Sequence, residues 1–237
     1  MCAWIEKLSG KKMGVFFVVA AILVTWGVFS SPAAAELIVI QIEAIAGDEA
    51  ASYVWAVPKV LDGANHMDWQ MPAPMTLVGG NGPIAALDML SLGFDGDPGV
   101  SLAFAFTAGA SATSFTLTSA TVSFAPLTNP LAYASAAITL TDTDGDGASL
   151  TGSFTGNKAY EAHYNAGPTV WAQILDPLSA AADMSVAGSA RQPASGRQQI
   201  MASLTSIQSS FSFTLSANDQ ASGTSRFDVR AVPEPGT

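Results

Sequence analysis

The chain has 237 residues, of which 49% are hydrophobic and 12% are charged, and its formal net charge is −10. Such an acidic chain is a poor partner for nucleic acid or for an anionic membrane surface, because the phosphates of both would repel it. The high content of apolar residues excludes a disordered chain and is sufficient for one sizeable domain.

Residues 1–35 have the pattern of a secretory signal peptide. Three lysines precede an uncharged, mostly apolar run over 13–29, and the small residues Ala33 and Ala35 offer a cleavage site. We expect cleavage after Ala35. An uncleaved anchor is the alternative, because the run is near the lower limit of about 17 residues for a spanning helix. Cleavage removes three lysines and one glutamate, which leaves six basic and eighteen acidic residues, a net charge of −12 and no cysteine.

The next part of the chain predicts short strands. Alternate isoleucines in 36–45 share one face, which predicts a first strand. Residues 53–57 form either a second strand or a short helix that ends at Pro58. The segment 61–83 is rich in proline and glycine, so we expect a long loop with little strand pairing.

The strand pattern becomes dense after residue 87. Alternation in 90–94 and 102–106 predicts a hairpin closed by a five-residue loop over 95–99. Residues 158–164 alternate between an aromatic face and a polar face, which predicts a strand. Residues 197–208 have apolar residues at helical spacing, which favours a helix there. Further strands are expected at 115–117, 122–124, 170–175, 184–186, 211–215 and 227–229.

The polar run Asp142–Gly147 is expected to turn a hairpin between strands at 138–141 and 150–154. Residues of one parity then predict the core: Ile138 and Leu140, Leu150 and Phe154, and Phe211, Phe213 and Leu215.

Many short strands with turn signals every 8–15 residues and no alternation with helices predict an all-β fold. We expect a single antiparallel β-sandwich, of jelly-roll or immunoglobulin-like type, over residues 36–230. The absence of a fixed-period repeat argues against a solenoid or a propeller.

Asp142, Asp144 and Asp146 stand at alternate positions, followed by a glycine, as at the start of a calcium loop. The bidentate acid expected at the twelfth position falls on Ser153, and the flanks are strands, so an EF-hand is excluded. Two alternatives are left: a hairpin that calcium holds together, or a solvated turn, because Asp and Gly are also common turn residues. Calcium is the one cofactor that the sequence suggests.

Trp69 is the candidate for stacking on a sugar ring, because its neighbours in 66–70 are mostly polar. Trp55 and Trp171 have apolar neighbours and are expected in the core.

The sequence shows no catalytic motif. The two histidines, His66 and His163, are far apart in the sequence, and His66 beside Asp68 could bind a metal only if further ligands converged on it. A glycosidase would need a pair of carboxylates, for which Glu43, Asp88 and Glu161 are the candidates. We therefore expect a protein that is not an enzyme.

The last segment contains Val232, Pro233, Glu234 and Pro235 in succession. This resembles the Val-Pro-Glu-Pro motif of the PEP-CTERM sorting-domain family of exported bacterial proteins. In that family, a membrane-spanning stretch and a basic tail come after the motif, whereas this chain stops at Thr237. Residues 231–237 would thus be the start of a truncated sorting signal, from a longer precursor or from a member whose anchor has been removed. Residues 137–165 also resemble a hairpin region of the family's cargo domains.

The resemblance implies handling by the export machinery and an exosortase, with membrane attachment only through the missing anchor. It also implies association with the cell envelope or an exopolysaccharide matrix. We therefore expect an exported structural or interaction protein of the cell surface or the extracellular space. A carbohydrate-binding module is the alternative, and a secreted hydrolase is the third.

Overall fold

Alternate side chains of the first strand, β1 (Leu37–Ala46), are buried, as the isoleucine spacing predicts: Ile40 and Ile42 are both 0% exposed. The computed structural model describes residues 37–58, 66–166 and 169–233. The strands of these ranges form one compact unit made of two antiparallel sheets packed face to face, a β-sandwich. The predicted all-β fold is confirmed.

The first sheet, sheet A, is nine-stranded within the described ranges. Its main path runs, in spatial order, through β12 (Thr169–Ile174), β11 (Tyr160–Tyr164), β16 (Ser203–Leu215), β7 (Thr113–Thr118), β1 and β2 (Glu49–Pro58). Three short strands extend it: β10 (Ala148–Gly152) and β8 (Val122–Thr128), which pair with β16, and β13 (Leu178–Ala180), which pairs with β10.

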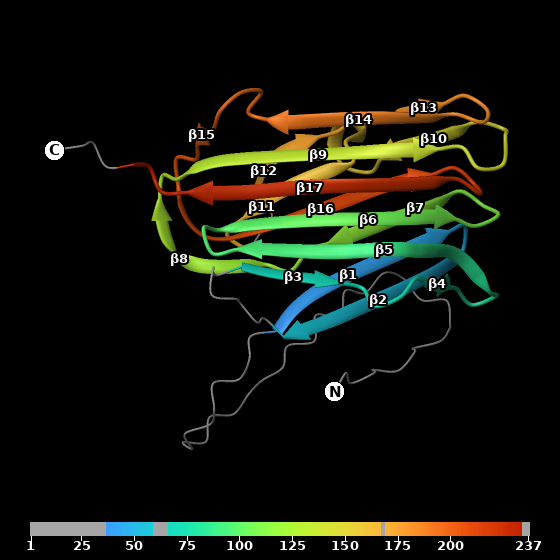
Figure 1. Cartoon of the computed structure of the whole chain (residues 1–237), viewed down its shortest axis with the longest axis horizontal. Coiled ribbons are helices and arrows are strands. Elements are labelled where there is room, and N and C mark those ends of the chain that lie inside the picture. The colour runs from blue at the N-terminus through green and yellow to red at the C-terminus, as the bar shows by residue number, and fades with distance from the viewer. Residues whose placement is uncertain (1–36, 59–65, 167–168, 234–237) are drawn as a thin grey trace, which may run out of the picture. The chain divides into compact units, whose positions relative to one another are not determined.

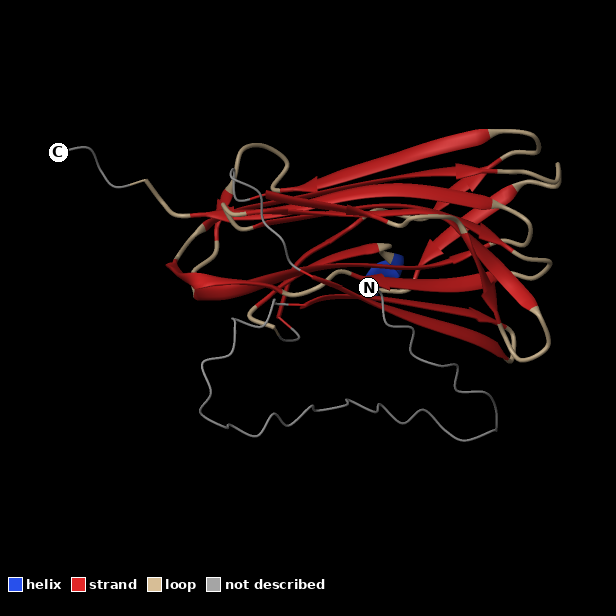
Figure 2. Ribbon diagram, turned by 60° about the horizontal axis from the view of Figure 1, so that its bottom comes forward, coloured by secondary structure: helices blue, strands red, loops and turns tan. Residues whose placement is uncertain are grey.

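The second sheet, sheet B, is eight-stranded in the same part of the chain. Its path runs through β14 (Ser185–Gln192), β9 (Leu131–Thr141), β17 (Gln220–Arg230), β6 (Gly99–Ala108), β5 (Pro83–Asp95) and β3 (His66–Gln70). In addition, β15 (Gln198–Gln199) pairs with β9, and β4 (Met75–Val78) pairs with β5. The described helical structure is the short 3₁₀ turn η1 (Thr155–Asn157), drawn in blue in Figure 2.

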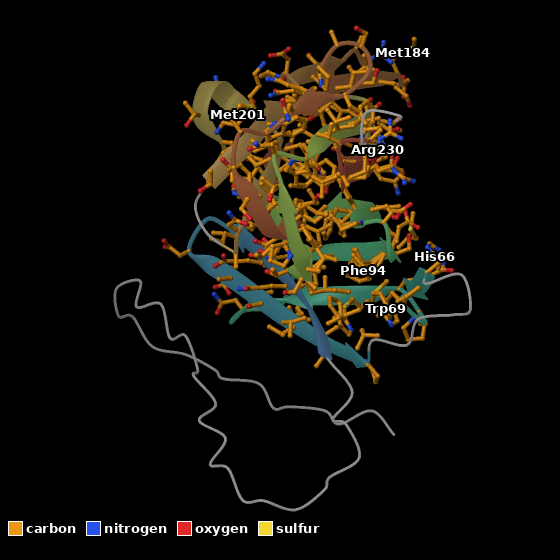
Figure 3. The ribbon with its side chains drawn as sticks, turned by 90° about the vertical axis from the view of Figure 1, so that its left-hand side faces the viewer. His66, Trp69, Phe94, Met184, Met201 and Arg230 are labelled. Atoms are coloured by element: carbon orange, nitrogen blue, oxygen red, sulfur yellow. The ribbon has the colours of Figure 1, made fainter. Side chains whose placement is uncertain are left out.

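Side chains fill the space between the two sheets (Figure 3), and aromatic rings from both sheets meet there. The ring centroids of Phe106 on β6 and Phe115 on β7 lie 4.5 Å apart, and those of Phe104 on β6 and Phe211 on β16 lie 4.8 Å apart. These contacts join sheet B to sheet A. Of the core residues predicted from strand parity, all are buried except Phe154, which lies half-buried at the isolated bridge to Lys158. Trp55 and Trp171, also expected in the core, are half-buried.

The segment 61–83 contains more strand than its composition predicts. Residues 59–65 lie outside the described part, but β3 and β4 both pair with β5. The prolines of this segment lie at a strand end or between strands, where they remove no ladder hydrogen bond, so they do not prevent pairing. The neighbouring hairpin of β5 and β6 forms as predicted, with Asp95 paired to Gly99 across the turn.

The prediction of a helix over 197–208 is wrong. This segment contains β15 and the start of β16, in which Leu204 and Ile207 are 0% exposed. The register of β16 against β8 shifts between Leu204 and Ser206, which indicates a bulge or irregularity. An added residue in a strand changes the parity of the residues after it, so an apolar spacing of three can occur in a strand as well as in a helix.

The predicted hairpin across Asp142–Gly147 is also wrong. β9 pairs with β14, β15 and β17 in sheet B, whereas β10 pairs with β13 and β16 in sheet A. The Asp/Gly loop therefore carries the chain from one sheet to the other, at the right-hand end of Figure 1. Among the described residues there is no helix both long and apolar enough to cross a membrane.

Candidate metal centre

Three connections between the sheets meet at this end of the sandwich. The first is the loop 142–147 from β9 to β10, the second joins β13 to β14, and the third joins β16 to β17. Each connection leaves the ladder of one sheet and enters the other, so its backbone groups need partners outside the strands. Aspartate side chains supply several of these partners.

Asp142 joins the first connection to the second. Its carboxylate accepts hydrogen bonds from the backbone N–H of Gly147 at 3.1 Å and of Asp183 at 2.5 Å, and its own N–H donates to the carbonyl of Met184 at 3.0 Å. Gly147 has φ +95°, in the region that favours glycine. Asp142 is 6% exposed, so these bonds lie in a largely dry environment.

Asp219 joins the first connection to the third. Its Oδ1 accepts a hydrogen bond from the backbone N–H of Thr143 at 3.3 Å, and its Oδ2 accepts one from the hydroxyl of Ser216. Asp219 is 0% exposed, just before β17 begins. A fully buried carboxylate is costly unless it is hydrogen-bonded or coordinates a metal, and each oxygen here has one protein donor.

One carboxylate oxygen from each of Asp142, Asp144 and Asp219 lies within 4.8 Å of the other two. Asp144 is exposed and accepts a hydrogen bond from the side-chain amide of Asn218 at 2.9 Å. This group could hold a metal ion. Three carboxylate oxygens suit a hard cation such as calcium, and carboxylate oxygens have enough lone pairs to coordinate an ion and accept a hydrogen bond together.

The charges of the group also affect its neighbours. The hydrogen bond from Asn218 lowers the pKa of Asp144. The pKa of Asp146 is raised, chiefly by the negative charge of Asp144 and next by the hydrogen bond between the side chains of Asp146 and Asp144. Smaller contributions include the charges of Asp142 and Asp219. A further negative charge is therefore disfavoured at this site, which is the electrostatic condition that attracts a cation.

The sequence predicts two of the three members of this group. Asp146 lies beside Asp144 but is not part of the group, and Asp219 is present in its place. Asp219 belongs to a different connection, far along the chain, so the spacing of the acidic run gives no signal for it. Its one local signal is the Asn218–Asp219 pair between two strand patterns, which is also typical of an ordinary turn.

The structure places Trp69 at one edge of the sandwich. Its ring centroid lies 6.2 Å from that of Trp55, which in turn lies 6.4 Å from that of Tyr53. Trp55, Trp69 and Trp171 are all half-buried and packed against the core. The polar neighbours of Trp69, Asp68 and Gln70, point to the opposite face of the sheet, so their polarity does not indicate that its ring is exposed.

His66 lies on the outer face of sheet B between two carboxylates. Its Nε2 is 3.0 Å from Asp68, and its Nδ1 is 2.7 Å from Asp95. Hydrogen bonds to Asp68, in the first place, and to Asp95 raise the pKa of His66. Asp95 also pairs with Arg226 at 3.1 Å, so this histidine belongs to an ion-pair network.

The acidic residues considered for a hydrolase are not brought together. Glu43 and Glu161 lie on strands of sheet A separated by three strand spacings, or about 14 Å. Catalytic carboxyl pairs lie within roughly 9.5 Å of each other. Asp88 is on sheet B, where the hydroxyl of Thr107 donates to it at 2.7 Å. Glu161 is buried and is bonded by Gln173 and by His163, the latter at 3.1 Å.

Of the terminal motif, Val232 and Pro233 are described, and Val232 is 44% exposed just beyond the end of β17. Glu234 and Pro235, like the predicted signal peptide, lie outside the described residues. Comparison with known protein families finds no matching family model, and comparison with curated proteins finds no matching sequence.

Proposed function

We propose that the protein is an exported, non-catalytic β-sandwich of the cell surface or extracellular matrix, in which a calcium ion joins the connections between its two sheets. The observation that carries this proposal is the convergence of Asp142, Asp144 and Asp219 from two different connections. An ion at this place would neutralise carboxylates that otherwise repel one another and would hold both sheets together at one end.

The affinity we propose is that of an extracellular calcium module, with a Kd on the order of 10⁻⁴–10⁻³ M. Three carboxylates are few for calcium, which takes 6–8 oxygen ligands, so backbone carbonyls and water would complete the shell. The existing hydrogen bonds of Asp142 and Asp219 already order the loops, so the ion would strengthen the fold without being needed to form it.

The proposed destination is supported by the two ends of the sequence. The pattern over 1–35 supports export, and the resemblance of Val232–Pro235 to the PEP-CTERM motif supports handling by an exosortase. The exposure of Val232 beyond the last strand is compatible with access by such an enzyme. An envelope-associated exopolysaccharide would be the surrounding partner.

The calcium proposal is tested by thermal unfolding in 10 mM calcium against chelator. Binding to the folded state alone should stabilise it by roughly 1.4–2.7 kcal/mol for a Kd in this range. For a domain of this size that corresponds to a rise in Tm of about 3–11 °C. The rise should shrink in Asp144→Asn and persist in Asp97→Asn, a matched change at an exposed turn outside the group. A Tm indifferent to calcium in the wild type would refute the proposal.

Export is tested independently by N-terminal sequencing of the protein recovered from outside the cells. The mature chain should begin at Glu36. Protein that still carries residues 13–29 would show an anchored chain and would contradict cleavage after Ala35.

A further inference from the structure

All four arginines of this acidic chain lie at one end of the outer face of sheet B. They line two shallow pockets of about 690 and 390 Å³, which share Tyr133 and Arg226. The two linings together contain four arginines and one acidic residue, Asp228. A chain with a net charge of −10 therefore presents a positive surface here.

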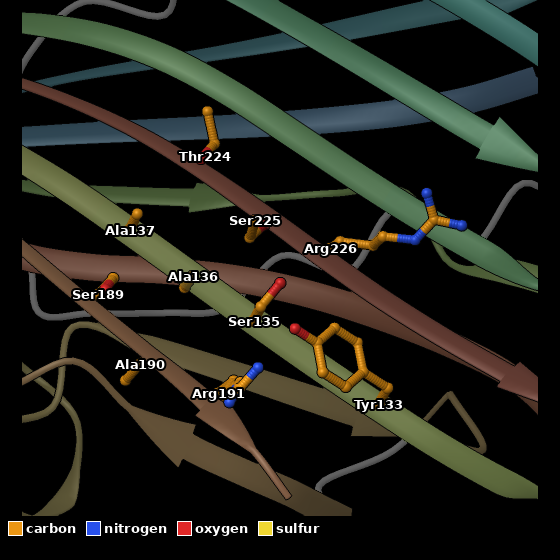
Figure 4. Close-up of a pocket in the computed structure, with 10 residues that line it drawn as sticks. All are labelled: Tyr133, Ser135, Ala136, Ala137, Ser189, Ala190, Arg191, Thr224, Ser225 and Arg226. Carbon is orange, nitrogen blue, oxygen red and sulfur yellow. The ribbon is translucent and has the colours of Figure 1, made fainter. Parts of the chain in front are cut away.

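The strand register explains how this surface forms. Ser135 on β9 is paired on one side with Arg191 of β14 and on the other with Arg226 of β17. The two arginines thus leave the sheet about 10 Å apart, two strand spacings, with one small side chain between them. Figure 4 shows Ser135 between Arg191 and Arg226, with Tyr133 beside it.

The floor of the larger pocket continues along the same strands as small side chains. Ala137 on β9 is paired with Ser189 of β14 and with Thr224 of β17. These small side chains leave a hollow along the strands over Ser135, Ala137, Ser189 and Thr224. We call this larger pocket, together with the smaller pocket that shares Tyr133 and Arg226 with it, the arginine trough.

Internal ion pairs hold two of the arginines in place. Arg226 pairs with Asp228 and with Asp95, each at 3.1 Å, and Arg197 pairs with Asp228. Arg191 and Arg230 are exposed and have no ion-pair partner within the described part of the chain. The trough thus combines one positioned guanidinium, Arg226, with others that are free to bind an external anion.

We propose that the arginine trough binds an acidic polysaccharide, through carboxylates held by Arg191, Arg226 and Arg230 and a sugar ring packed on Tyr133. Guanidinium groups bind carboxylates in bidentate geometry, and an aromatic ring offers an apolar face to a sugar. The inference rests on the proposed extracellular function, to which it adds the class of glycan and a contact site away from Trp69.

The net charge of the whole molecule favours this ligand over a denser polyanion. A nucleic acid carries a phosphate at every nucleotide, and the acidic surface around the trough repels it. A polysaccharide with widely spaced carboxylates places few charges outside the arginines. The trough is also open along the strands, so a long chain can pass through it.

The test is binding of the purified protein to hyaluronate, which carries a carboxylate on every second sugar, with neutral dextran as the control polymer, in chelator and low salt. We expect binding to hyaluronate alone, weakened by added salt. In the variant Arg191→Ala with Arg230→Ala the affinity should fall at least tenfold. Lys158→Ala, which removes one positive charge on the connection before β11, should bind as the wild type does, and each single arginine variant should bind more weakly than it.

Ser135→Phe distinguishes binding in the trough from non-specific electrostatic binding, because the larger side chain fills the trough and leaves every arginine in place. Its binding should fall as well, with an unchanged circular dichroism spectrum. Full binding by this variant, an equal loss in Lys158→Ala, or no binding by the wild type would overturn the proposal. Sedimentation without polymer gives one more check. Self-association that the arginine variants abolish would make this face a contact between copies of the chain, and would also overturn the proposal.

Failure here is distinguishable from failure of the proposed function. The binding assay needs neither calcium nor export, whereas the Tm assay and N-terminal sequencing do not depend on the trough.

Discussion

Phe213 offers the sharpest test of how the two sheets pack. It lies on β16 in the middle of sheet A and is 0% exposed. Its ring centroid is 5.7 Å from that of Phe115 in the same sheet, and 5.8 and 6.4 Å from those of Phe104 and Phe106 in the opposite sheet. Phe213→Ala removes a ring that packs against three other rings.

The expected cost is about 3–5 kcal/mol, because both the transfer energy of the ring and the cavity left behind contribute. Each aromatic pair is worth about 0.5–1.5 kcal/mol beyond area burial, and three pairs are lost, so we expect the upper half of that range. In a domain of this size the Tm should fall by about 8–20 °C.

The assay is urea unfolding monitored by tryptophan fluorescence, with the slope of the transition compared between variants. Val54→Ala is the control, because Val54 on β2 is 61% exposed and its truncation should change stability by less than about 0.5 kcal/mol. A loss below about 1 kcal/mol in Phe213→Ala at unchanged slope would mean that β16 does not face the second sheet.

Three further predictions concern other parts of the fold. Gly152→Ala should unfold the protein or lower its Tm sharply, because the new Cβ would lie 2.1 Å from the backbone of Lys158, and a normal Tm would contradict this packing. The pKa of His66, measured by NMR titration, should exceed 6.5 in the wild type and be lower in Asp95→Asn, and equal pKa values in the two proteins would refute the pairing. The stability contributed by protonated His66 is complete below pH 6.5 and is lost as the pH rises through the pKa of the folded state. Asp146→Asn should raise the Tm at neutral pH in chelator. The pKa of Asp146 is raised in the folded state, so its ionised carboxylate destabilises the native state above that pKa. A lower Tm in this variant would contradict the repulsion between Asp146 and Asp144.

The strands and their buried faces could be predicted from the sequence, because alternation is a local property. Residues such as Ile40, Leu140 and Phe213 are buried as their parity predicts. Which strands pair is not local. The run Asp142–Gly147 has the chemistry of a turn, and the same chemistry suits a hairpin and a crossing between sheets. The pairing of β9 and β10 with different sheets therefore could not be deduced from it.

The candidate metal centre was predictable only in part for the same reason. Asp142 and Asp144 belong to one run and are recognisable by their spacing. Asp219 joins them only because the connection from β16 to β17 passes between the sheets at the same end of the sandwich as the loop 142–147. The arginines of the trough are likewise unrelated in spacing, and the registers of β14 and β17 against β9 bring Arg191 and Arg226 together.

The most direct test of the account is the number of calcium ions bound, measured by isothermal titration of the purified protein. The geometry of the two connections predicts one ion per chain, and no binding in Asp219→Asn once circular dichroism has shown that the variant is folded. Binding that is absent in the wild type, or that is unchanged in folded Asp219→Asn, would contradict a metal centre built by Asp142, Asp144 and Asp219.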